Sequence, residues 1–405
     1  MSKRLFVVLS LFVAAAMLLA SCGGATSTYT CTDAIGCVTI APGDPIHIVY
    51  ALVVAGPNES LGIDSRNGIE IAISDTGGTI LDHPVQFDGE DTGCSAEGGQ
   101  AAGTKLAADP TIVAVIGTNC SSEARVAMPL FSAAGFVVVS PSNTAPDLTE
   151  AGNPNNYPGY LRTAHNDKVQ GAVAAEFVYN ELGLRKAATI HDGSLYAEKL
   201  QEVFATHFVE LGGTITAQEA VDPAQTDMSS VLTSIAAGGP EIIYFPIFMP
   251  AGGFLIRQAR NTPGLEAVKL MGADGLFSSD VMEGGGAEIE GFLVSSPLTQ
   301  GAEYDAFVAK YQEMFGSAPI SIFHAHAYDA YMMIKAAIEK VAIVQSDGTV
   351  IIPRQALRDA VYATANFDGL TGNLTCTPTG DCADPYIAVY EYHAGQYPPE
   401  VIWKP

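Results

Sequence analysis

Residues 112–146 have the sequence IVAVIGTNCSSEARVAMPLFSAAGFVVVSPSNTAP, and this stretch decides the fold. Two apolar runs, 112–116 and 136–139, flank an amphipathic segment at 122–134 that ends before Gly135. Short apolar runs without alternation are typical of strands buried on both faces, and the segment between them has helical length and spacing. The stretch therefore predicts a strand, a helix and a second strand of a parallel sheet that is covered on both sides.

The same alternation continues along the chain in both directions. Apolar runs predict strands at 46–54, 85–88, 112–116, 136–139, 187–191, 214–220, 241–245 and 291–294, with helical patterns such as 122–134, 168–182, 195–211 and 254–260 between them. One series ends near residue 162 and a second, equivalent series ends near 295; helical patterns at 304–315 and 323–340 and a strand-like run at 386–392 follow. We expect two similar α/β lobes, because 405 residues exceed what one core usually organises.

The first 44 residues have a different composition. Two basic residues precede an apolar run at 5–20, and Ser21 and Cys22 follow it. The junction has the sequence Leu19-Ala20-Ser21-Cys22. The run is short for a membrane span, and small residues before a cysteine are typical of a bacterial lipoprotein cleavage site. We expect a signal peptide at 1–21, a lipid on Cys22 and a Gly-, Thr- and Ser-rich tether at 22–44. The alternative is an ordinary signal peptide in which Cys22 is incidental.

The charge balance limits the classes of partner. The chain has 44 acidic and 19 basic residues and a formal net charge of −25. Such a surface disfavours nucleic acid and anionic lipid as partners, although it does not indicate the ligand of a local site. No segment after the first apolar run is apolar enough to span a bilayer, so we expect membrane attachment through the lipid alone.

The cysteine count fits an oxidising compartment. Assigning one of the seven cysteines to lipid leaves six, which can pair completely. Fifteen connectivities are possible, and proximity in the sequence favours the pairs Cys31 with Cys37, Cys376 with Cys382, and Cys94 with Cys120. A zinc site is the alternative, but no Cys-x-x-Cys occurs and no histidine has ligand spacing beside these residues.

Motifs of common enzyme and metal sites are missing or fit poorly. Two Asp-Thr-Gly triplets, at 75–77 and 91–93, are too close together for the two symmetric halves of an aspartic protease, and turn chemistry explains both. The chain contains neither a nucleophile elbow nor a phosphate-binding glycine loop. His324 and His326 have no third ligand beside them, which favours packing or capping. We therefore expect a protein that is not an enzyme and that uses no cofactor or metal.

Three polar loops follow predicted strands, at 117–122, 140–146 and 272–275. Open α/β sheets bind ligands at the carboxyl ends of their strands. Ser121 begins a predicted helix, where a hydroxyl beside free backbone N–H groups suits a carboxylate. Asp274 offers one carboxylate across a cleft, which suits an ammonium group. Simple N-capping by Ser121 and a plain Asp-Gly turn are the alternatives.

Several ordered motifs extend over the whole body and carry a specific resemblance. They are Asn119-Cys120-Ser121-Ser122, Ser140-Pro141-x-x-Thr144-x-Pro146-x-Leu148-Thr149, Leu161-Arg162-Thr163, Ile190-His191-Asp192 with Tyr196 beyond, Arg257-Gln258-Ala259-Arg260 and Met271-Gly272-x-Asp274-Gly275. Through them, residues 45–395 resemble the leucine/isoleucine/valine-binding protein family, the type I periplasmic binding proteins of ABC importers.

The resemblance implies a fold and its boundaries. Members of this family have two doubly wound α/β lobes joined by three hinge crossovers. We expect an N-terminal lobe at 45–163 and 296–366 and a C-terminal lobe at 164–295 and 367–405. The hinges then lie near Thr163, near Ser295 and at 365–372.

The resemblance also implies roles for individual residues. Ser121 and Thr144 would hold the α-carboxylate of an amino acid, with a backbone contact from Ser142. Tyr196 would close over the ligand, and Asp274 would receive the α-ammonium group. The disulfide that this family has before the first ligand loop would join Cys94 to Cys120, in agreement with the cysteine count.

Three positions depart from the family pattern and affect the shape of the pocket. Asp274 stands where the family often has the longer Glu, Leu61 aligns near an aromatic residue, and Phe248 replaces a tyrosine. The identity of the ligand is therefore open. We expect an amino acid with a branched-chain or other apolar side chain. A short amide, a urea-like solute or a small carboxylate is the alternative.

The resemblance completes the functional hypothesis. A monomeric, lipid-anchored protein outside the cytoplasmic membrane would capture the solute and close around it. A membrane permease with cytoplasmic ATPases would then take the solute from the closed protein. The second hypothesis is a ligand-sensing receptor on the same fold, which would deliver a signal instead of cargo.

Overall fold

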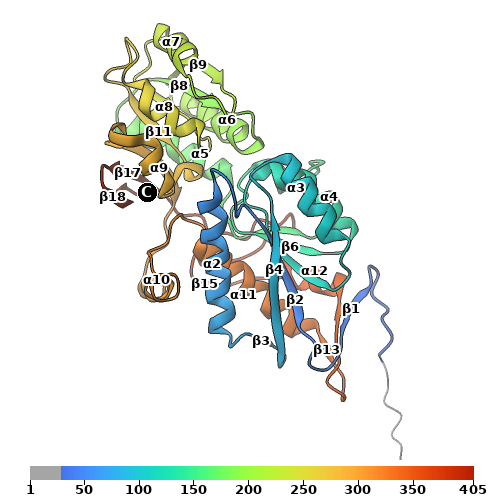
Figure 1. Ribbon diagram of the computed structural model, residues 1–405. Coiled ribbons are helices and arrows are strands. Elements are labelled where there is room, and N and C mark those ends of the chain that lie inside the picture. Colours follow the sequence, from blue (N-terminus) through green and yellow to red (C-terminus); the bar gives the residue numbers. More distant parts are fainter. Residues whose placement is uncertain (1–28) are drawn as a thin grey trace, which may run out of the picture.

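The computed structural model describes residues 29–405, which form two α/β lobes (Figure 1). The expected signal segment and Cys22 lie outside the described residues. Each lobe is built on one mostly parallel sheet with helices on both faces. This arrangement confirms the predicted fold class.

The first lobe contains a six-stranded sheet in the order β3-β4-β2-β5-β6-β7. Its strands are β2 (Ile46–Leu52), β3 (Thr79–Ile80), β4 (His83–Asp91), β5 (Ile112–Gly117), β6 (Val137–Ser140) and β7 (Tyr160–Arg162). All neighbours are parallel except the pair β3 and β4. The helices of this lobe are α2 (Glu59–Asp75), α3 (Ala96–Ala107), α4 (Ser121–Ala133), α10 (Ala302–Phe315), α11 (His324–Val341) and α12 (Arg354–Tyr362).

Side-chain alternation along these strands builds two separate apolar layers. On β2, Ile46 and Ile48 pack with residues of α2, α11 and α12, whereas Val49 and Ala51 pack with residues of α3 and α4. In Figure 1, α2 and α11 lie on one side of β4, and α3 and α4 lie on the other. The central strands β5 and β6 are buried along their whole length, which is why the sequence shows apolar runs there, whereas β4 is partly exposed and contains polar residues.

The second lobe contains a seven-stranded sheet in the order β18-β17-β12-β11-β10-β8-β9. Its strands are β8 (Lys186–His191), β9 (Thr214–Ala220), β10 (Ile242–Tyr244), β11 (Lys269–Gly272), β12 (Phe292–Pro297), β17 (Ile387–His393) and β18 (Gln396–Trp403). The last two strands are antiparallel and extend the sheet beyond β12. The helices are α5 (Asp167–Glu176), α6 (Leu195–Glu210), α7 (Ser229–Ala237), α8 (Ala251–Ala259) and α9 (Asp280–Gly285).

Aromatic stacking marks the core of the second lobe. Phe204 lies 4.2 Å from Tyr244 and 5.6 Å from Phe208, measured between ring centroids, and all three are fully buried. Burial of each large side chain contributes roughly 1.5–3 kcal/mol to folding. This core anchors α6 on the sheet and so fixes the first turn of α6, which contributes to the site described below.

The folded body begins earlier than the sequence indicates. Residues 22–44 were expected to be a tether, but β1 (Cys37–Ile40) pairs with β14 (Val350–Pro353), which also pairs with β13 (Ile343–Val344). The Asp33 carboxylate accepts hydrogen bonds from the backbone N–H groups of Gln355 and Ala356 at the start of α12. Pairing with a distant strand makes β1 part of the first lobe, and no local pattern reveals such a partner.

The chain crosses between the lobes three times, at 163–166, 298–301 and 383–386. The third crossover lies later than the expected hinge at 365–372. That segment contains the hairpin of β15 (Phe367–Gly369) and β16 (Gly372–Leu374), which packs on the first lobe. Leu374 is fully buried in the first-lobe core. The sequence placed the lobe boundary after residue 366, before this hairpin. In the structure the boundary follows the hairpin, so the hairpin belongs to the first lobe.

Three disulfides confirm the predicted pairing. They join Cys31 to Cys37, Cys94 to Cys120, and Cys376 to Cys382. Among residues 29–405, no helix is both long and apolar enough to cross a membrane.

Candidate functional site

A small cavity lies where the carboxyl ends of the strands of both lobes meet. The surrounding side chains nearly fill it, and the remaining space has room for about one water molecule. Its lining consists of Leu61, Asn119, Ser121, Ser142, Tyr196, Phe248, Asp274, Gly275 and Phe323. Five of the six predicted ligand residues therefore line one cavity, and Thr144 lies beside it, fully buried.

On the side of the first lobe, Ser121 presents a free hydroxyl donor. Ser121 is the first residue of α4, and its Oγ accepts a hydrogen bond of 3.2 Å from the backbone N–H of Ala145. None of the described residues accepts a hydrogen bond from this hydroxyl. A hydroxyl has one donor and two acceptor positions, so its proton remains available for an anionic group in the cavity.

Asn119 ties the two ligand loops of the first lobe together. Its Oδ1 accepts a hydrogen bond from the backbone N–H of Val53, and its Nδ2 donates to the Oγ atoms of Ser65 and Ser142. The Ser142 hydroxyl in turn donates to the Asn119 carbonyl at 3.0 Å. Because its proton is engaged, this hydroxyl has no donor left for a ligand carboxylate, and the backbone N–H of Ser142 already donates to Ser140 Oγ at 3.3 Å.

Thr144 and Asp167 form a second polar contact next to the cavity. The backbone N–H of Asp167 donates to the Thr144 carbonyl at 3.0 Å. The Thr144 Oγ1 and both Asp167 carboxylate oxygens are buried and have no hydrogen-bond partner among the described residues. The two side chains lie close enough for Thr144 to oppose the rise in the pKa of the Asp167 carboxyl, and neither of them lines the cavity.

On the side of the second lobe, Asp274 is held by two donors. Its Oδ1 accepts hydrogen bonds from Gln170 Nε2 at 2.7 Å and from the Tyr196 hydroxyl at 3.0 Å. The Tyr196 hydroxyl also accepts from the backbone N–H of Gly275 at 3.1 Å. The other oxygen, Asp274 Oδ2, accepts no hydrogen bond from another described residue, which leaves an acceptor for a cation in the cavity.

Burial dominates the titration of both acids at the site. Burial raises the pKa of Asp274 to about 6, while the hydrogen bonds from Gln170 and Tyr196 oppose the shift. Burial raises the pKa of Asp167 even further above its ordinary value, and the neighbouring Asp274 charge adds to the effect. A buried cation would be the natural partner of such carboxylates, because an unpaired buried charge is costly.

A separate acidic group beside a disulfide is not a metal centre. Sγ atoms of Cys94 and Cys120 and a carboxylate oxygen of Glu123 lie within 4.8 Å of one another. Both sulfurs belong to one disulfide and offer no thiolate. Glu123 Oε2 accepts a hydrogen bond from the backbone N–H of Cys120 at 2.9 Å, so the carboxylate caps α4.

The comparison with known protein families agrees with this geometry. Residues 45–396 match the family model described as "Periplasmic binding protein". The chain belongs to the periplasmic binding protein family. The match covers both lobes and all three crossovers.

Relatives of this periplasmic binding protein include proteins that are named for different ligands or were solved with different ligands. A leucine-, isoleucine-, valine-, threonine- and alanine-binding protein of Pseudomonas aeruginosa is 28% identical over 86% of this chain and 90% of the relative. A leucine-binding protein structure from Thermotoga maritima has a TM-score of 0.78 at 25% identity and covers 88% of this chain and 98% of that chain. A solute-binding protein of an ABC transporter from R. palustris, in complex with benzoate, has a TM-score of 0.76 at 19% identity and covers 89% of this chain and 96% of that chain, which shows the fold alone.

Apolar side chains complete the cavity of this periplasmic binding protein. Leu61 is 5% exposed and Phe323 is 3% exposed, and both come from the first-lobe side. The Tyr196 ring lies 4.9 Å from the ring of Phe248 on the second-lobe side. Since the Tyr196 hydroxyl is fully used, Tyr196 offers the cavity an aromatic wall and a support for Asp274.

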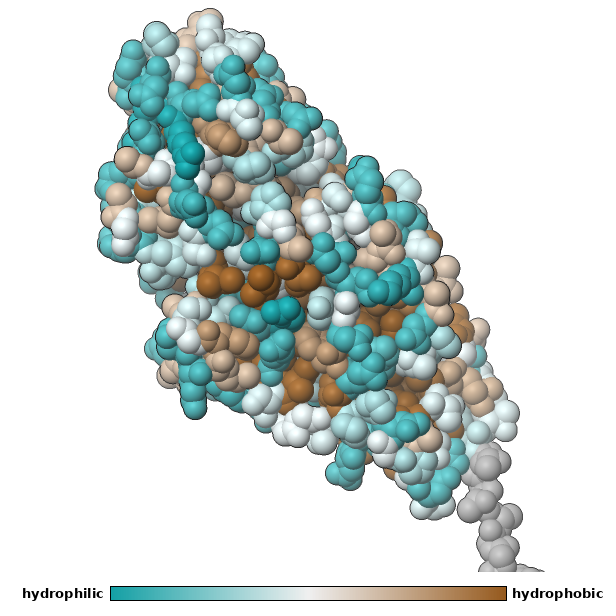
Figure 2. Space-filling model, in the orientation of Figure 1, coloured by the Kyte–Doolittle hydropathy of each residue, from teal (hydrophilic) through white to brown (hydrophobic). Residues whose placement is uncertain are grey.

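Direct contacts join the lobes beside the cavity. Asn58 exchanges two hydrogen bonds of 3.1 Å with the backbone of Met249, and Ser122 Oγ accepts one of 3.0 Å from the backbone N–H of Leu195. Figure 2 shows apolar surface near the junction of the lobes in the orientation of Figure 1. The cleft of this periplasmic binding protein is therefore closed, with its polar groups shielded from water.

Sequence reasoning missed two residues of the site. Asp167 and Gln170 lie in the first turn of α5, directly after the first crossover. Their spacing of three residues places them on one face of the helix, and this spacing was the available signal. The strand that precedes them, β7, has only three residues and no apolar run marks it in the sequence, so the rule used for the other loops did not include them.

Proposed function

We propose that this periplasmic binding protein captures an amino acid with an apolar side chain. The observation that carries the proposal is the opposed pair of free polar atoms in one cavity. The Ser121 hydroxyl offers a donor from the first lobe, and Asp274 Oδ2 offers an acceptor from the second. The carboxylate and ammonium groups of an amino acid are adjacent charges of opposite sign and complement this pair.

Closure of the lobes follows from the same arrangement. A zwitterion that contacts Ser121 and Asp274 makes its full set of contacts only when the lobes approach, so it stabilises the closed form. The apolar lining from Leu61, Phe248 and Phe323 suits a branched-chain or other apolar side chain.

The transport role is part of the proposal. We infer that the chain delivers its solute to an ABC import permease and its ATPases, acts as a monomer and catalyses no reaction. The Pseudomonas and Thermotoga relatives are named as amino acid-binding proteins, which supports this assignment. The apolar run at 5–20 and the sequence Leu19-Ala20-Ser21-Cys22 support an extracytoplasmic protein with a lipid on Cys22.

The second candidate is a small carboxylate such as benzoate. The R. palustris neighbour in complex with benzoate favours it, as does the raised pKa of Asp274, because a protonated carboxyl group can donate to an anion. The charge of Asp274 argues against it at neutral pH, since a carboxyl group with a pKa of about 6 is mostly ionised there and repels an anion.

Isothermal titration calorimetry of the purified chain tests the proposal. The panel contains L-leucine, L-isoleucine, L-valine, leucinamide, isovalerate and benzoate. We expect heat from the apolar amino acids only, because leucinamide lacks the carboxylate and isovalerate lacks the ammonium group. Binding of benzoate or isovalerate without binding of any amino acid would overturn the assignment in favour of small carboxylates.

The lipid anchor needs a separate test. We expect cells that express the chain to incorporate labelled palmitate into it and to lose this label in the Cys22→Ser variant. Equal labelling of both proteins, or label in neither, would refute lipidation at Cys22 without affecting the ligand assignment.

A further inference from the structure

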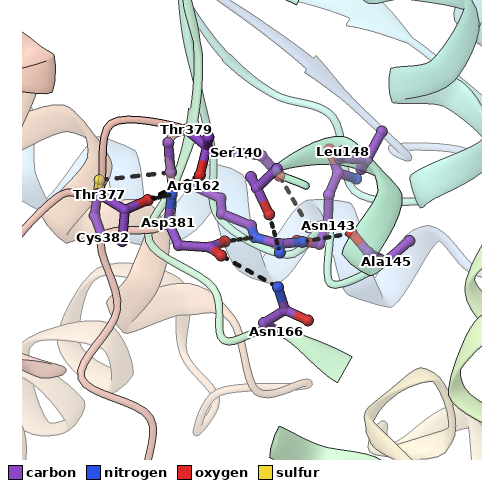
Figure 3. A network of polar contacts seen from close by, with 12 residues as sticks. Ser140, Asn143, Ala145, Leu148, Arg162, Asn166, Thr377, Thr379, Asp381 and Cys382 are labelled. Atoms are coloured by element: carbon purple, nitrogen blue, oxygen red, sulfur yellow. Dashed lines mark hydrogen bonds and ion pairs between the residues drawn. The ribbon is translucent and has the colours of Figure 1, made fainter. Parts of the chain in front are cut away.

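Arg162 is a fully buried residue that supports a ligand loop from behind (Figure 3). Its Nη1 donates to the carbonyls of Asn143 and Ala145 at 3.0 and 2.9 Å, and its Nη2 donates to Thr149 Oγ1 at 2.7 Å. The two carbonyls belong to the residues on either side of Thr144. The guanidinium therefore fixes the backbone that places the unpartnered Thr144 hydroxyl.

Asp381 supports the backbone around Thr144 through two hydrogen-bond partners. Its Oδ1 accepts from Arg162 Nε at 2.5 Å, and its Oδ2 accepts from Asn166 Nδ2 at 3.1 Å. Asn166 also caps α5, where the next residue, Asp167, donates its backbone N–H to the Thr144 carbonyl. Asp381 thus reaches Thr144 through Arg162 on one path and through Asn166 and Asp167 on the other.

A small disulfide loop holds Asp381 in this position. Cys376 and Cys382 are six residues apart, and Asp381 lies directly before the second of them. The loop pairs with β7, because the Arg162 N–H donates to the Gly380 carbonyl and the Cys382 N–H donates to the Arg162 carbonyl. Although burial opposes ionisation, the Arg162 charge keeps the pKa of Asp381 below its ordinary value. Neither Asp381 nor Arg162 lines the cavity.

We propose that Asp381, held by the Cys376–Cys382 loop, is a positioning residue for the ligand site. It sets ligand affinity by holding the 140–146 loop and the start of α5 without touching the ligand. The expected effect of Asp381 on affinity rests on the proposed function. The conformation of the loop can be measured without any ligand.

Amide hydrogen exchange of the ligand-free full chain tests the positioning role. In Asp381→Asn, we expect exchange at the Ala145 and Asp167 amides to become at least about tenfold faster, because one charged partner of a buried network is removed. The Val138 amide in the same sheet should keep its wild-type rate. A purely structural role would accelerate all three amides together.

Disulfide variants provide a matched comparison. Cys376→Ser with Cys382→Ser keeps Asp381 and should reproduce its effect on the two amides. Cys31→Ser with Cys37→Ser opens a loop of the same size elsewhere in the first lobe and should leave those amides unchanged. If Asp381→Asn does not fold, the first pair alone decides the question.

Titration with L-leucine supplies the functional readout. We expect Asp381→Asn to weaken binding about tenfold and Asp381→Glu to recover part of the loss. If the wild-type chain binds no amino acid, the proposed function fails while the exchange data still decide the positioning role. Exchange at Ala145 and Asp167 within twofold of wild type in both Asp381→Asn and the Cys376/Cys382 variant would overturn the proposal.

Discussion

Replacing Asp274 with asparagine changes one atom of the site and separates a binding role from a structural one. The amide oxygen can still accept the hydrogen bonds that Gln170 Nε2 and the Tyr196 hydroxyl donate to Oδ1. The amide nitrogen then replaces the free Oδ2 in the cavity. An acceptor that faces the ligand becomes a donor, so an ammonium group meets two N–H groups instead of a carboxylate.

The expected loss of affinity follows from the contact that disappears. A hydrogen bond to a charged group contributes about 1.5–3 kcal/mol, which corresponds to roughly a 10- to 150-fold change in the dissociation constant. We expect Asp274→Asn to raise the dissociation constant for L-leucine by at least about tenfold. Isothermal titration calorimetry at pH 7.5 measures this change, with Asp280→Asn, an acid that does not line the cavity, as the control.

The expected change in stability has the opposite sign. Because the pKa of Asp274 is raised from 3.8 to about 6, its ionised form weakens the folded state by about 3 kcal/mol at neutral pH. This cost is absent below the ordinary pKa and complete above about pH 6. Asparagine removes it, so the melting temperature of the ligand-free variant should rise by several degrees.

Two results would refute this reasoning. Wild-type affinity of Asp274→Asn for L-leucine would mean that the carboxylate does not receive the ammonium group. A lower melting temperature together with weaker binding would mean that Asp274 acts mainly by holding Gln170 and Tyr196 in place.

The remaining predictions concern pH, the carboxylate contact and one disulfide. Affinity for L-leucine should fall about tenfold per pH unit below about pH 6, because protonated Asp274 cannot accept a hydrogen bond from the ammonium group. Titrations from pH 8 to 5 that show constant affinity would contradict this prediction. Ser121→Ala should weaken L-leucine binding by about tenfold or more, since it removes a donor to a charged group, and unchanged calorimetric affinity would exclude that contact. Replacing Cys94 and Cys120 with alanine should lower the free energy of unfolding by roughly 3 kcal/mol, because the disulfide closes a separation of 26 residues; a loss under about 1 kcal/mol in urea denaturation would show that the unfolded loop is already constrained.

Much of the fold was predictable because its signals are local. All eight strands expected from the sequence are present, from β2 to β12, and the signal is clearest in β5, β6 and β10, which are buried along their whole length and therefore apolar. The three disulfides were also predictable, because an even count and short separations left one favoured pairing. Ser121 and Asp274 were found because each follows the carboxyl end of a strand.

Other elements depend on partners that are distant in the sequence. β7 has only three residues and lies at the edge of its sheet, beside β6. β1 acquires strand structure from pairing with β14, more than three hundred residues away. The third crossover lies at 383–386 because Leu374 is buried in the first-lobe core, and no feature of the sequence near residue 366 indicates that contact.

By itself, the sequence determined the α/β class, the two lobes and the polar groups at the strand ends, because spacing and residue type act within one element. Only the tertiary structure decided which of these groups share a cavity and which atoms remain free. It places the Ser121 hydroxyl and Asp274 Oδ2 in one closed space, and it brings Asp167, Gln170 and Asp381 to the same region from other elements. Hydrogen bonds across long separations use up most donors and acceptors, and the few that remain free define what the cavity can bind.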